Sequence, residues 1–433
     1  MKTNTPTKIN VITMGCSKNL VDSEKLMGQL RYNNLEVTHE SGADSDYVVI
    51  NTCGFIKDAK EESIETILNL IEAKKEGRLK KVYVMGCLSE RYLDDLKEEF
   101  PDADGIYGVN DMEEIVNDIG ADYKKELVGE RVISTPSHFA YLKISEGCDR
   151  TCAFCAIPLI RGKHISLPMD EIIIEAEKLR DQGVKELILI AQDLSYYGID
   201  IYGKKMLGDL LDRLSNIEGI KWIRLHYTYP TQFPDNVLQM MKEKSNICHY
   251  MDIPLQHIND RILLSMRRGH SGATTRKLIT KFREYVPDIS IRTTLIVGYP
   301  GETEEEFQQL LDFVEESRFD RLGAFTYSPE ENTHAFNLED SVSEEEKINR
   351  YNRLMNLQEQ ISLQKNESRI GNTYKVLIDR KEGNEYYGRT EYDSPEVDNE
   401  VIIESYENLS IGDFYRVKIT GAEAFDLIGE IEN

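Results

Sequence analysis

The chain has 433 residues, of which 40% are hydrophobic and 30% are charged. This length predicts about three domains with buried cores, and the composition excludes a disordered polymer. The 77 acidic residues outnumber the 52 basic ones, and the net charge of −25 argues against a general nucleic-acid binder, because Lys and Arg bind phosphates. We see no signal peptide and no run of about 18 apolar residues that could span a membrane. A cytoplasmic protein is therefore expected, with its seven cysteines as reduced thiols or metal ligands.

The first 120 residues alternate strand-like and helical patterns. Three apolar runs are the expected strands: 9–14, 47–50 and 82–85. A helix between the last two is expected to present one apolar face, formed by four residues at helical spacing: Ile64, Ile67, Leu68 and Ile71. Strands alternating with helices predict a doubly wound parallel sheet for an N-terminal domain over residues 1–120, and the polar stretch 121–138 is a predicted linker.

From residue 139 the same rhythm resumes at larger spacing. Six strands are expected: 140–144, 187–191, 222–226, 250–254, 289–297 and 323–327. Six β/α units are too few for a closed eight-stranded barrel, so we predict a partial, open (β/α)6 barrel over 139–367, with ligands at the strand carboxyl ends. Thr303 and Glu306 predict a capping box. A last helix from Ser343 to about Ser368 is expected to carry an apolar face of three residues: Ile348, Tyr351 and Met355.

Short strands separated by Gly, Asn and Pro fill the rest of the chain. They are expected at 374–378, 385–389, 401–403, 414–419 and 426–431. This pattern predicts a small all-β barrel over residues 368–433. The fold class is therefore α/β, with a β barrel at the end of the chain.

One group of three cysteines lies within eight residues, directly after the strand expected at 140–144. Cys148, Cys152 and Cys155 follow the spacing C-x3-C-x2-C. Thiolates bind iron or zinc, but a structural zinc needs four ligands, and His164, nine residues further on, is a distant candidate for the fourth. Three thiolates on a [4Fe–4S] cluster leave one iron open for a substrate. The alternative of three buried core thiols is weak, because Asp149 and Arg150 make the segment polar.

A second group of three cysteines is dispersed in the sequence. Cys16, Cys53 and Cys87 each follow an expected strand of the N-terminal domain. The carboxyl ends of parallel strands open onto one edge of a sheet, so these three residues are expected to converge. Flanking glycines, which allow close backbone approach, support convergence over three unrelated turns: Gly15, Gly54 and Gly86. The seventh cysteine, Cys248, is expected to be a packed or free thiol.

The C-x3-C-x2-C motif resembles the radical S-adenosylmethionine (SAM) superfamily, and Phe154 before the last cysteine fits that motif. Over nearly the whole chain the sequence resembles the radical-SAM methylthiotransferase family, through three segments: GCSKNLVDSE with NTCGFI and GCLSERY, AYLKISEGCDRTCAFCAIPLIRGKHISLP, and a TRAM-like, OB-like end. This resemblance implies a transferase with two [4Fe–4S] clusters that inserts a methylthio group at an unactivated C–H bond. SAM would be both the methyl donor and the source of a 5′-deoxyadenosyl radical, and the second cluster would hold or supply the sulfur.

Two branches of this family compete for the substrate. One modifies a tRNA adenosine, and the other modifies the β-carbon of an aspartate in small-subunit ribosomal protein S-twelve. The motif GCSKNLVDSE and the pair Gln192-Asp193 resemble the ribosomal-protein branch. The segment from Gly371 holds fifteen acidic and six basic residues, a net charge of −9, which would repel RNA and attract a basic protein. We therefore favour S-twelve, and keep the tRNA enzyme and a non-catalytic iron–sulfur scaffold as alternatives.

The resemblance also implies SAM-binding positions in addition to the six cysteines. These are five residues around the strand carboxyl ends: Phe154, Gln192, Arg292, Ile296 and Gly298. Turn geometry without a ligand is an equally good interpretation of Gly298. Tyr227 and Tyr229 could line the pocket or pack, and His257 is expected to be a surface or structural residue. The partners implied are S-twelve, an electron donor and a sulfur source, with no membrane and no specific nucleic-acid site.

Overall fold

The computed structural model describes residues 7–42, 45–405 and 408–432. It divides into two compact units, and the chain passes between them several times. The first unit holds 1–135, 141–150 and 155–181, and the second holds 136–140, 151–154 and 182–433. Cys148 and Cys155 thus belong to the first unit and Cys152 to the second. Within the described residues, no helix is long and apolar enough to cross a membrane.

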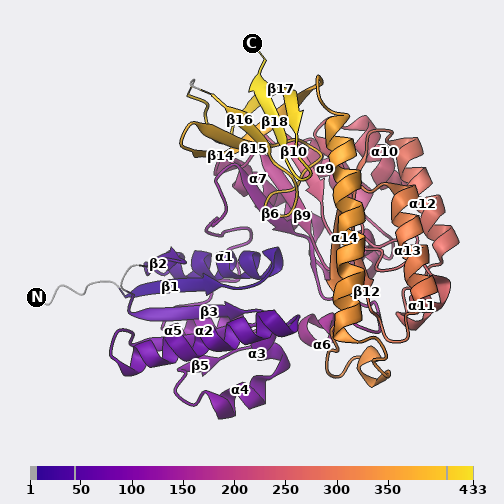
Figure 1. Ribbon diagram of the computed structural model, residues 1–433. Helices are drawn as coiled ribbons and strands as arrows, with labels where there is room; N and C mark the ends of the chain where they lie inside the picture. The colour runs from indigo at the N-terminus through magenta and orange to yellow at the C-terminus, as the bar shows by residue number, and fades with distance from the viewer. Residues whose placement is uncertain (1–6, 43–44, 406–407, 433) are drawn as a thin grey trace, which may run out of the picture. The chain divides into compact units, whose positions relative to one another are not determined.

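A five-stranded parallel sheet forms the centre of the first unit (Figure 1). Its order is β2 (Glu36–His39), β1 (Lys8–Thr13), β3 (Tyr47–Thr52), β4 (Lys81–Gly86) and β5 (Gly105–Ile106). The three predicted strands are confirmed as β1, β3 and β4. The edge strands β2 and β5 were not predicted, because four and two residues are too few to give a periodic pattern.

Helices cover both faces of this sheet, which confirms the doubly wound prediction. One face packs on α1 (Ser17–Tyr32) and α5 (Met112–Ile119), and the other on α2 (Lys57–Lys75), α3 (Cys87–Arg91) and α4 (Leu93–Glu99). The predicted face of α2 is only half right. Ile67 and Ile71 are buried, whereas Ile64 and Leu68 are exposed, because the helix covers the sheet with a narrower stripe than its apolar residues could form.

The rest of the first unit is irregular or short. No helix or strand lies between α5 and β6 (Phe139–Lys143), where the linker was expected, but the segment packs on α1, since Val132 N donates to Glu24 O. The cysteine loop follows β7 (Ser145–Glu146) and leads into α6 (Ile157–Arg161). Then come β8 (Ile165–Ser166), antiparallel to β7, and α7 (Met169–Asp181).

An open six-stranded sheet forms the second unit, as the partial-barrel prediction required. Its order is β13 (Arg321–Thr326), β12 (Ser290–Val297), β11 (Ile247–Asp252), β10 (Trp222–Leu225), β9 (Glu186–Ile190) and β6, whose first two residues lie in this unit. Neighbouring strands from β9 to β13 are parallel. All six expected strands are confirmed, with ends shifted by one to three residues.

The connections between these strands are helical. They contain η1 (Leu194–Tyr196), α8 (Ile199–Tyr202), α9 (Leu207–Ser215), α10 (Asp235–Glu243), α11 (Asp260–Ser265), α12 (Gly272–Tyr285) and α13 (Glu304–Ser317), and η2 (Ala335–Asn337) follows β13. Thr303 and Glu306 form the predicted capping box at α13. Ser343 caps α14 (Glu344–Glu367), but the predicted apolar face is wrong, because Ile348 is exposed. The buried face is mixed: Lys347, Arg350, Leu354, Gln358 and Ile361.

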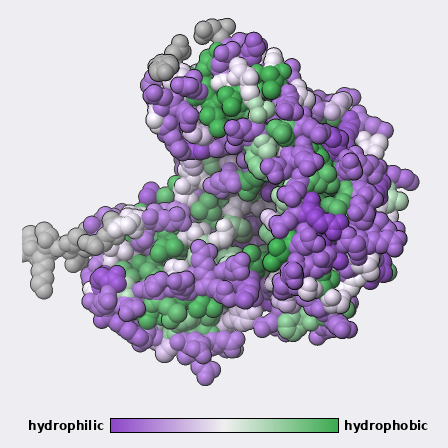
Figure 2. Space-filling view, viewed as in Figure 1, coloured by the Kyte–Doolittle hydropathy of each residue, from purple (hydrophilic) through white to green (hydrophobic). Residues whose placement is uncertain are grey.

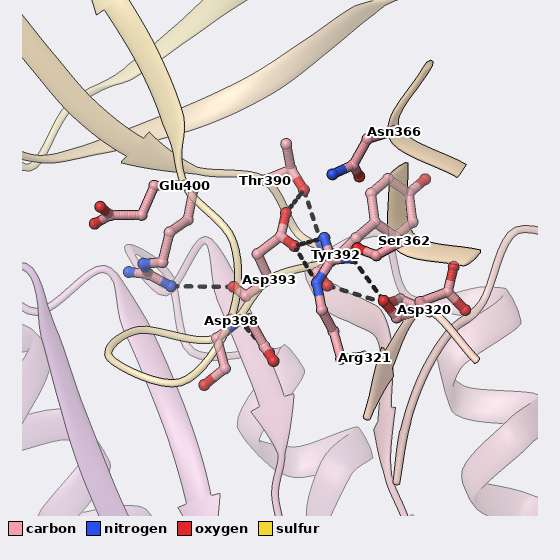
Figure 3. A network of polar contacts seen from close by, with 12 residues as sticks. Asp320, Arg321, Ser362, Asn366, Thr390, Tyr392, Asp393, Asp398 and Glu400 are labelled. Atoms are coloured by element: carbon pink, nitrogen blue, oxygen red, sulfur yellow. Dashed lines mark hydrogen bonds and ion pairs between the residues drawn. The ribbon is translucent and has the colours of Figure 1, made fainter. Parts of the chain in front are cut away.

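A closed five-stranded barrel ends the chain, as predicted. Its order is β14 (Thr373–Glu382), β15 (Glu385–Arg389), β16 (Val401–Glu404), β18 (Leu427–Ile431) and β17 (Phe414–Ala422). The segment 389–398, which begins at the end of β15, reaches the open sheet through polar side chains. Asp393 accepts from Arg321 and Thr390, and the group is shown in Figure 3.

Buried ion pairs join this barrel to the sheet. Arg389 is 1% exposed and pairs with Glu186 of β9 at 2.9 Å and with Asp379 of β14 at 2.6 Å. Burial opposes the charge on Asp379, but Arg389 and His138 outweigh it and lower the pKa of that carboxyl to about 2. Asp398 accepts from Tyr250 at 2.6 Å and from Arg292 at 3.2 Å. The barrel and the open sheet therefore share one polar core.

Replacing Arg389 with Leu is expected to destabilise the protein strongly. The change removes the arginine that pairs with Asp379 and one of the two arginines that pair with Glu186, and breaking a buried ion-pair group in this way costs about 3–5 kcal/mol of unfolding free energy. Urea denaturation followed by circular dichroism measures this loss. Arg416→Leu removes an exposed barrel arginine that pairs with Glu432, and it should leave the transition within error. Equal effects of the two changes would contradict a shared polar core.

Candidate iron–sulfur site

The dispersed cysteines lie where the sheet topology was expected to place them. Cys16 is the N-cap of α1, three residues beyond the end of β1, Cys53 directly follows β3, and Cys87 directly follows β4. These strands are adjacent and parallel, with β3 in the middle. The three thiols therefore lie along one sheet edge, with Cys16 exposed, Cys53 partly buried and Cys87 buried.

Two glycines allow the three cysteine segments to pack against one another. Gly15 has φ +92°, and a Cβ there would lie 2.8 Å from Cys53 Sγ. A Cβ on Gly54 would lie 2.8 Å from the backbone N of Leu88, the residue after Cys87. The glycine signal in the sequence thus reflects a real close approach of the three turns.

The surroundings of Cys87 include two polar groups that sequence reasoning missed. Its Sγ donates to Asn19 Oδ1 at 3.4 Å, and Arg161 Nη2 donates to the same sulfur at 3.4 Å. Burial raises the pKa of the Cys87 thiol to about 11, and Arg161 opposes this rise. Burial also raises the pKa of Cys53. A metal bound by these two thiols would have to displace their protons.

The closely spaced cysteines, Cys148, Cys152 and Cys155, lie in the loop between β7 and α6. Cys148 N donates to Gly162 O at 3.0 Å, and Cys148 Sγ accepts from Arg150 N at 3.4 Å. In the second unit, Cys152 Sγ accepts from Arg268 Nη1 at 3.3 Å. Ala153 is held by Met266 O and Ala335 N. All three thiols are partly exposed, as ligands of an open cluster would need to be.

Four of the five predicted SAM positions lie at or near the carboxyl ends of strands or in the cysteine loop. Phe154 and Ile296 share one apolar cluster. Gln192 lies two residues beyond β9, and Gly298 directly follows β12. Arg292 is different. It is the third residue of β12 instead of lying at its end, and its guanidinium contacts Asp398 and Asp252.

The turn after β12 is fixed by a buried carboxylate. Glu302 accepts from Gly298 N at 2.6 Å and from Arg350 at 2.7 Å, and it contacts His257 Nε2 at 2.9 Å. Gly298 has φ +71°, and a Cβ there would lie 2.3 Å from Lys347 Cγ. Both turn geometry and packing therefore require glycine at this position. His257 is fully buried, so it is not a surface residue, and its contact with Glu302 is structural.

The remaining candidates are structural in their contacts. His164 is buried and contacts Ser166 Oγ at 3.0 Å. Cys248 is buried in an apolar cluster with Trp222, and burial raises the pKa of its thiol to about 12. Tyr229 donates to Arg268 O at 2.6 Å, and its hydroxyl lies 4.0 Å from Cys152 Sγ. Tyr229 thus lies next to Cys152.

The six cysteines of the two triads are also candidate ligands of a single metal ion. Among the described residues, no three His, Cys, Asp or Glu side chains are close enough to share one metal ion.

Comparisons with known proteins identify the family of the chain. The radical SAM superfamily matches residues 142–314, the uncharacterized protein family UPF0004 matches 8–108, and the TRAM domain matches 370–431. Proteins named "Ribosomal protein uS12 methylthiotransferase RimO" match almost end to end. The one from Cytophaga hutchinsonii is 57% identical and covers 99% of each chain, and that from Christiangramia forsetii is 58% identical over 98% of this chain and 94% of its own. The one from Phocaeicola vulgatus is 56% identical over 100% of both.

Solved structures support the fold. The radical SAM methyltransferase TsrM from Kitasatospora setae has a TM-score of 0.54 at 14% identity and covers 74% of this chain and 75% of its own. The radical enzyme OxsB has a TM-score of 0.52 at 12% identity, over 82% of this chain and 56% of its own.

The cysteine loop at the start of an open β/α sheet, with the superfamily match over it, defines a radical SAM enzyme. The second triad and the terminal barrel narrow this class to the methylthiotransferases. The chain belongs to the family of uS12 methylthiotransferases named RimO.

Gly15→Ala is expected to impair the second triad selectively. The added Cβ would clash with Cys53, so about four of roughly eight irons per chain should be lost. Iron analysis after anaerobic reconstitution measures this. Gly77→Ala is the matched control, since Gly77 has φ +79° but no atom within 4 Å of its Cβ position. Full iron content in Gly15→Ala would show that the turns need not touch.

Proposed function

We propose that the chain is a radical-SAM methylthiotransferase that modifies the β-carbon of an aspartate in ribosomal protein S-twelve, which its relatives' names call uS12. The full-length identity of 53–58% to proteins of that name carries this proposal. The site geometry supports it, because two separate cysteine triads suit two clusters. When bound, the two [4Fe–4S] clusters and SAM supply the radical, the methyl group and the sulfur for C–H methylthiolation.

Each cysteine triad would hold one of the two clusters. Cys148, Cys152 and Cys155 would hold the cluster that binds SAM, because they begin the open β/α sheet at whose carboxyl edge ligands bind. Cys16, Cys53 and Cys87 would hold the second cluster at the edge of the N-terminal sheet. We also propose the predicted domain limits, with an N-terminal domain over 1–120, a radical-SAM domain over 139–367 and a TRAM domain over 368–433.

SAM would be positioned by the loops at the carboxyl edge of the open sheet. Phe154 and Ile296 offer apolar surface, while Gln192 offers a carboxamide. Glu302 orders the Gly298 turn before any ligand arrives, which reduces the entropy lost on binding. A SAM contact by Arg292 remains a prediction, and it would compete with two carboxylates that already hold this guanidinium.

The terminal barrel would contact the basic substrate protein. Part of its acidic bias is used internally, because Asp393 and Asp398 pair with arginines of the open sheet and Asp413 pairs with Lys185. The remaining carboxylates share the surface with apolar residues, seen as green patches on the barrel in Figure 2. Exposed examples are Ile411, Phe425 and Ile428. We propose that acidic and apolar side chains of the barrel together contact the substrate protein. The protein would act in the cytoplasm, and its further partners would be an electron donor and a sulfur source.

Deleting this gene is expected to remove the methylthio group from S-twelve and to leave tRNA nucleosides unchanged. Mass spectrometry of ribosomal proteins and nucleoside analysis from the same strain measure both. Loss of a methylthio nucleoside instead, with S-twelve still modified, would favour the tRNA branch. Re-expression of the intact chain should restore the modification.

Replacing the two triads in turn is expected to affect SAM cleavage and methylthio transfer differently. Replacing Cys16, Cys53 and Cys87 with Ala should preserve reductive formation of 5′-deoxyadenosine but abolish transfer. Replacing Cys148, Cys152 and Cys155 should abolish both. Chromatographic assay under anaerobic dithionite reduction measures cleavage, and Cys248→Ala is the thiol control. Absence of cleavage in the intact chain would favour a non-catalytic scaffold.

A further inference from the structure

Arg161 connects the segment that carries the first triad to a cysteine of the second. It is the last residue of α6, which begins two residues after Cys155. Its Nη2 donates to Cys87 Sγ at 3.4 Å and to Asn19 Oδ1. Ala156 and Ile160 of the same segment pack on Cys87. One short segment thus meets Cys87 with both apolar contact and a cation.

The guanidinium is held in place by groups other than cysteine. Nη1 donates to Asp22 at 2.8 Å and to Glu146 at 2.9 Å. Lys143 donates to the same two carboxylates. The two cations and two carboxylates balance in charge, and the Arg161 side chain is 2% exposed. The direction of the Arg161 fork is therefore set within the protein and does not depend on a ligand.

We propose that Arg161 is a positioning residue for the second cluster, donating a charge-assisted hydrogen bond to the Cys87 thiolate and fixing the orientation of that ligand. This inference rests on the proposed function, since it requires a cluster on Cys16, Cys53 and Cys87. Hydrogen bonds to ligating sulfurs and nearby positive charge favour the reduced, more negative cluster and so raise its reduction potential. Bonds with a charged donor are about twice as strong as neutral ones.

The test uses the full chain with Cys148, Cys152 and Cys155 replaced by Ala, so that only the second cluster remains. Arg161→Met and Arg161→Lys are made in that background, reconstituted with iron and sulfide, and titrated by electron paramagnetic resonance. Each should hold about four irons. The Met variant should show a tenfold or greater loss in the reduction equilibrium constant, about 59 mV for one electron, and the Lys variant an intermediate shift.

Two controls locate the effect. Arg161→Met in a chain lacking Cys16, Cys53 and Cys87 should leave the potential of the first cluster unchanged. Lys163→Met removes an exposed cation two residues away, and it should leave the second cluster unchanged. Circular dichroism of the iron-free chains shows whether the variants fold alike.

The outcomes separate this role from the proposed function. An unchanged potential in Arg161→Met at full iron content would overturn the role of Arg161 alone. If the Met variant fails to take up iron, iron uptake by the Lys variant supports the role of Arg161. Failure of the Lys variant to take up iron as well overturns that role. Absence of iron with Arg161 intact would overturn the two-cluster assignment and this inference with it.

Discussion

The carboxamide of Asn19 fixes the sheet edge on which the second cysteine triad is built. This residue is fully buried in the first turn of α1. Its Nδ2 donates to Met14 O at 2.9 Å, beyond β1, and to Thr52 O at 3.0 Å, the last residue of β3. Its Oδ1 accepts from Cys87, the residue after β4. One side chain thereby ties together the ends of three neighbouring strands. Parallel pairing aligns the strands, and Asn19 adds hydrogen bonds to residues at or just beyond the ends of all three.

In the second unit, buried ion pairs hold the elements together. Glu186, Arg224 and Arg389 form one ion-paired group, in which Arg224 is 2.7 Å and Arg389 is 2.9 Å from Glu186. Breaking such a group leaves an unpaired charge in a medium of low polarity, so its members hold one another in place. The acidic composition of the barrel is thus partly a requirement of the fold. A charge total taken from the sequence could not separate these buried carboxylates from those that face a partner.

Regular patterns allowed much of the fold to be predicted from the sequence. The central strands are apolar runs, and the three dispersed cysteines were recognisable because each follows such a run. The face of α14 was not predictable, because Lys347 and Arg350 are buried by ion pairs with Asp340 and Glu302, which no local periodicity reveals. Asn19, Arg161 and Arg268 were missed for the same reason. Their partners are 68, 74 and 116 residues away in the sequence. No local pattern marks an arginine that contacts a distant cysteine.

The same chemical arrangement occurs once at each triad. Arg161 donates to Cys87 in the first unit, and Arg268 donates to Cys152 in the second. Each thiolate that binds a cluster brings a negative charge into a partly desolvated site, which is costly unless a cation lies nearby. Arginine suits this role better than lysine or histidine, because its charge persists at every physiological pH and its fork has further donors for anchoring. Arg161 uses them on Asp22 and Glu146, and Arg268 uses one on Pro254 O. Each pair lies within a single unit, so one cysteine of each triad has an arginine beside it.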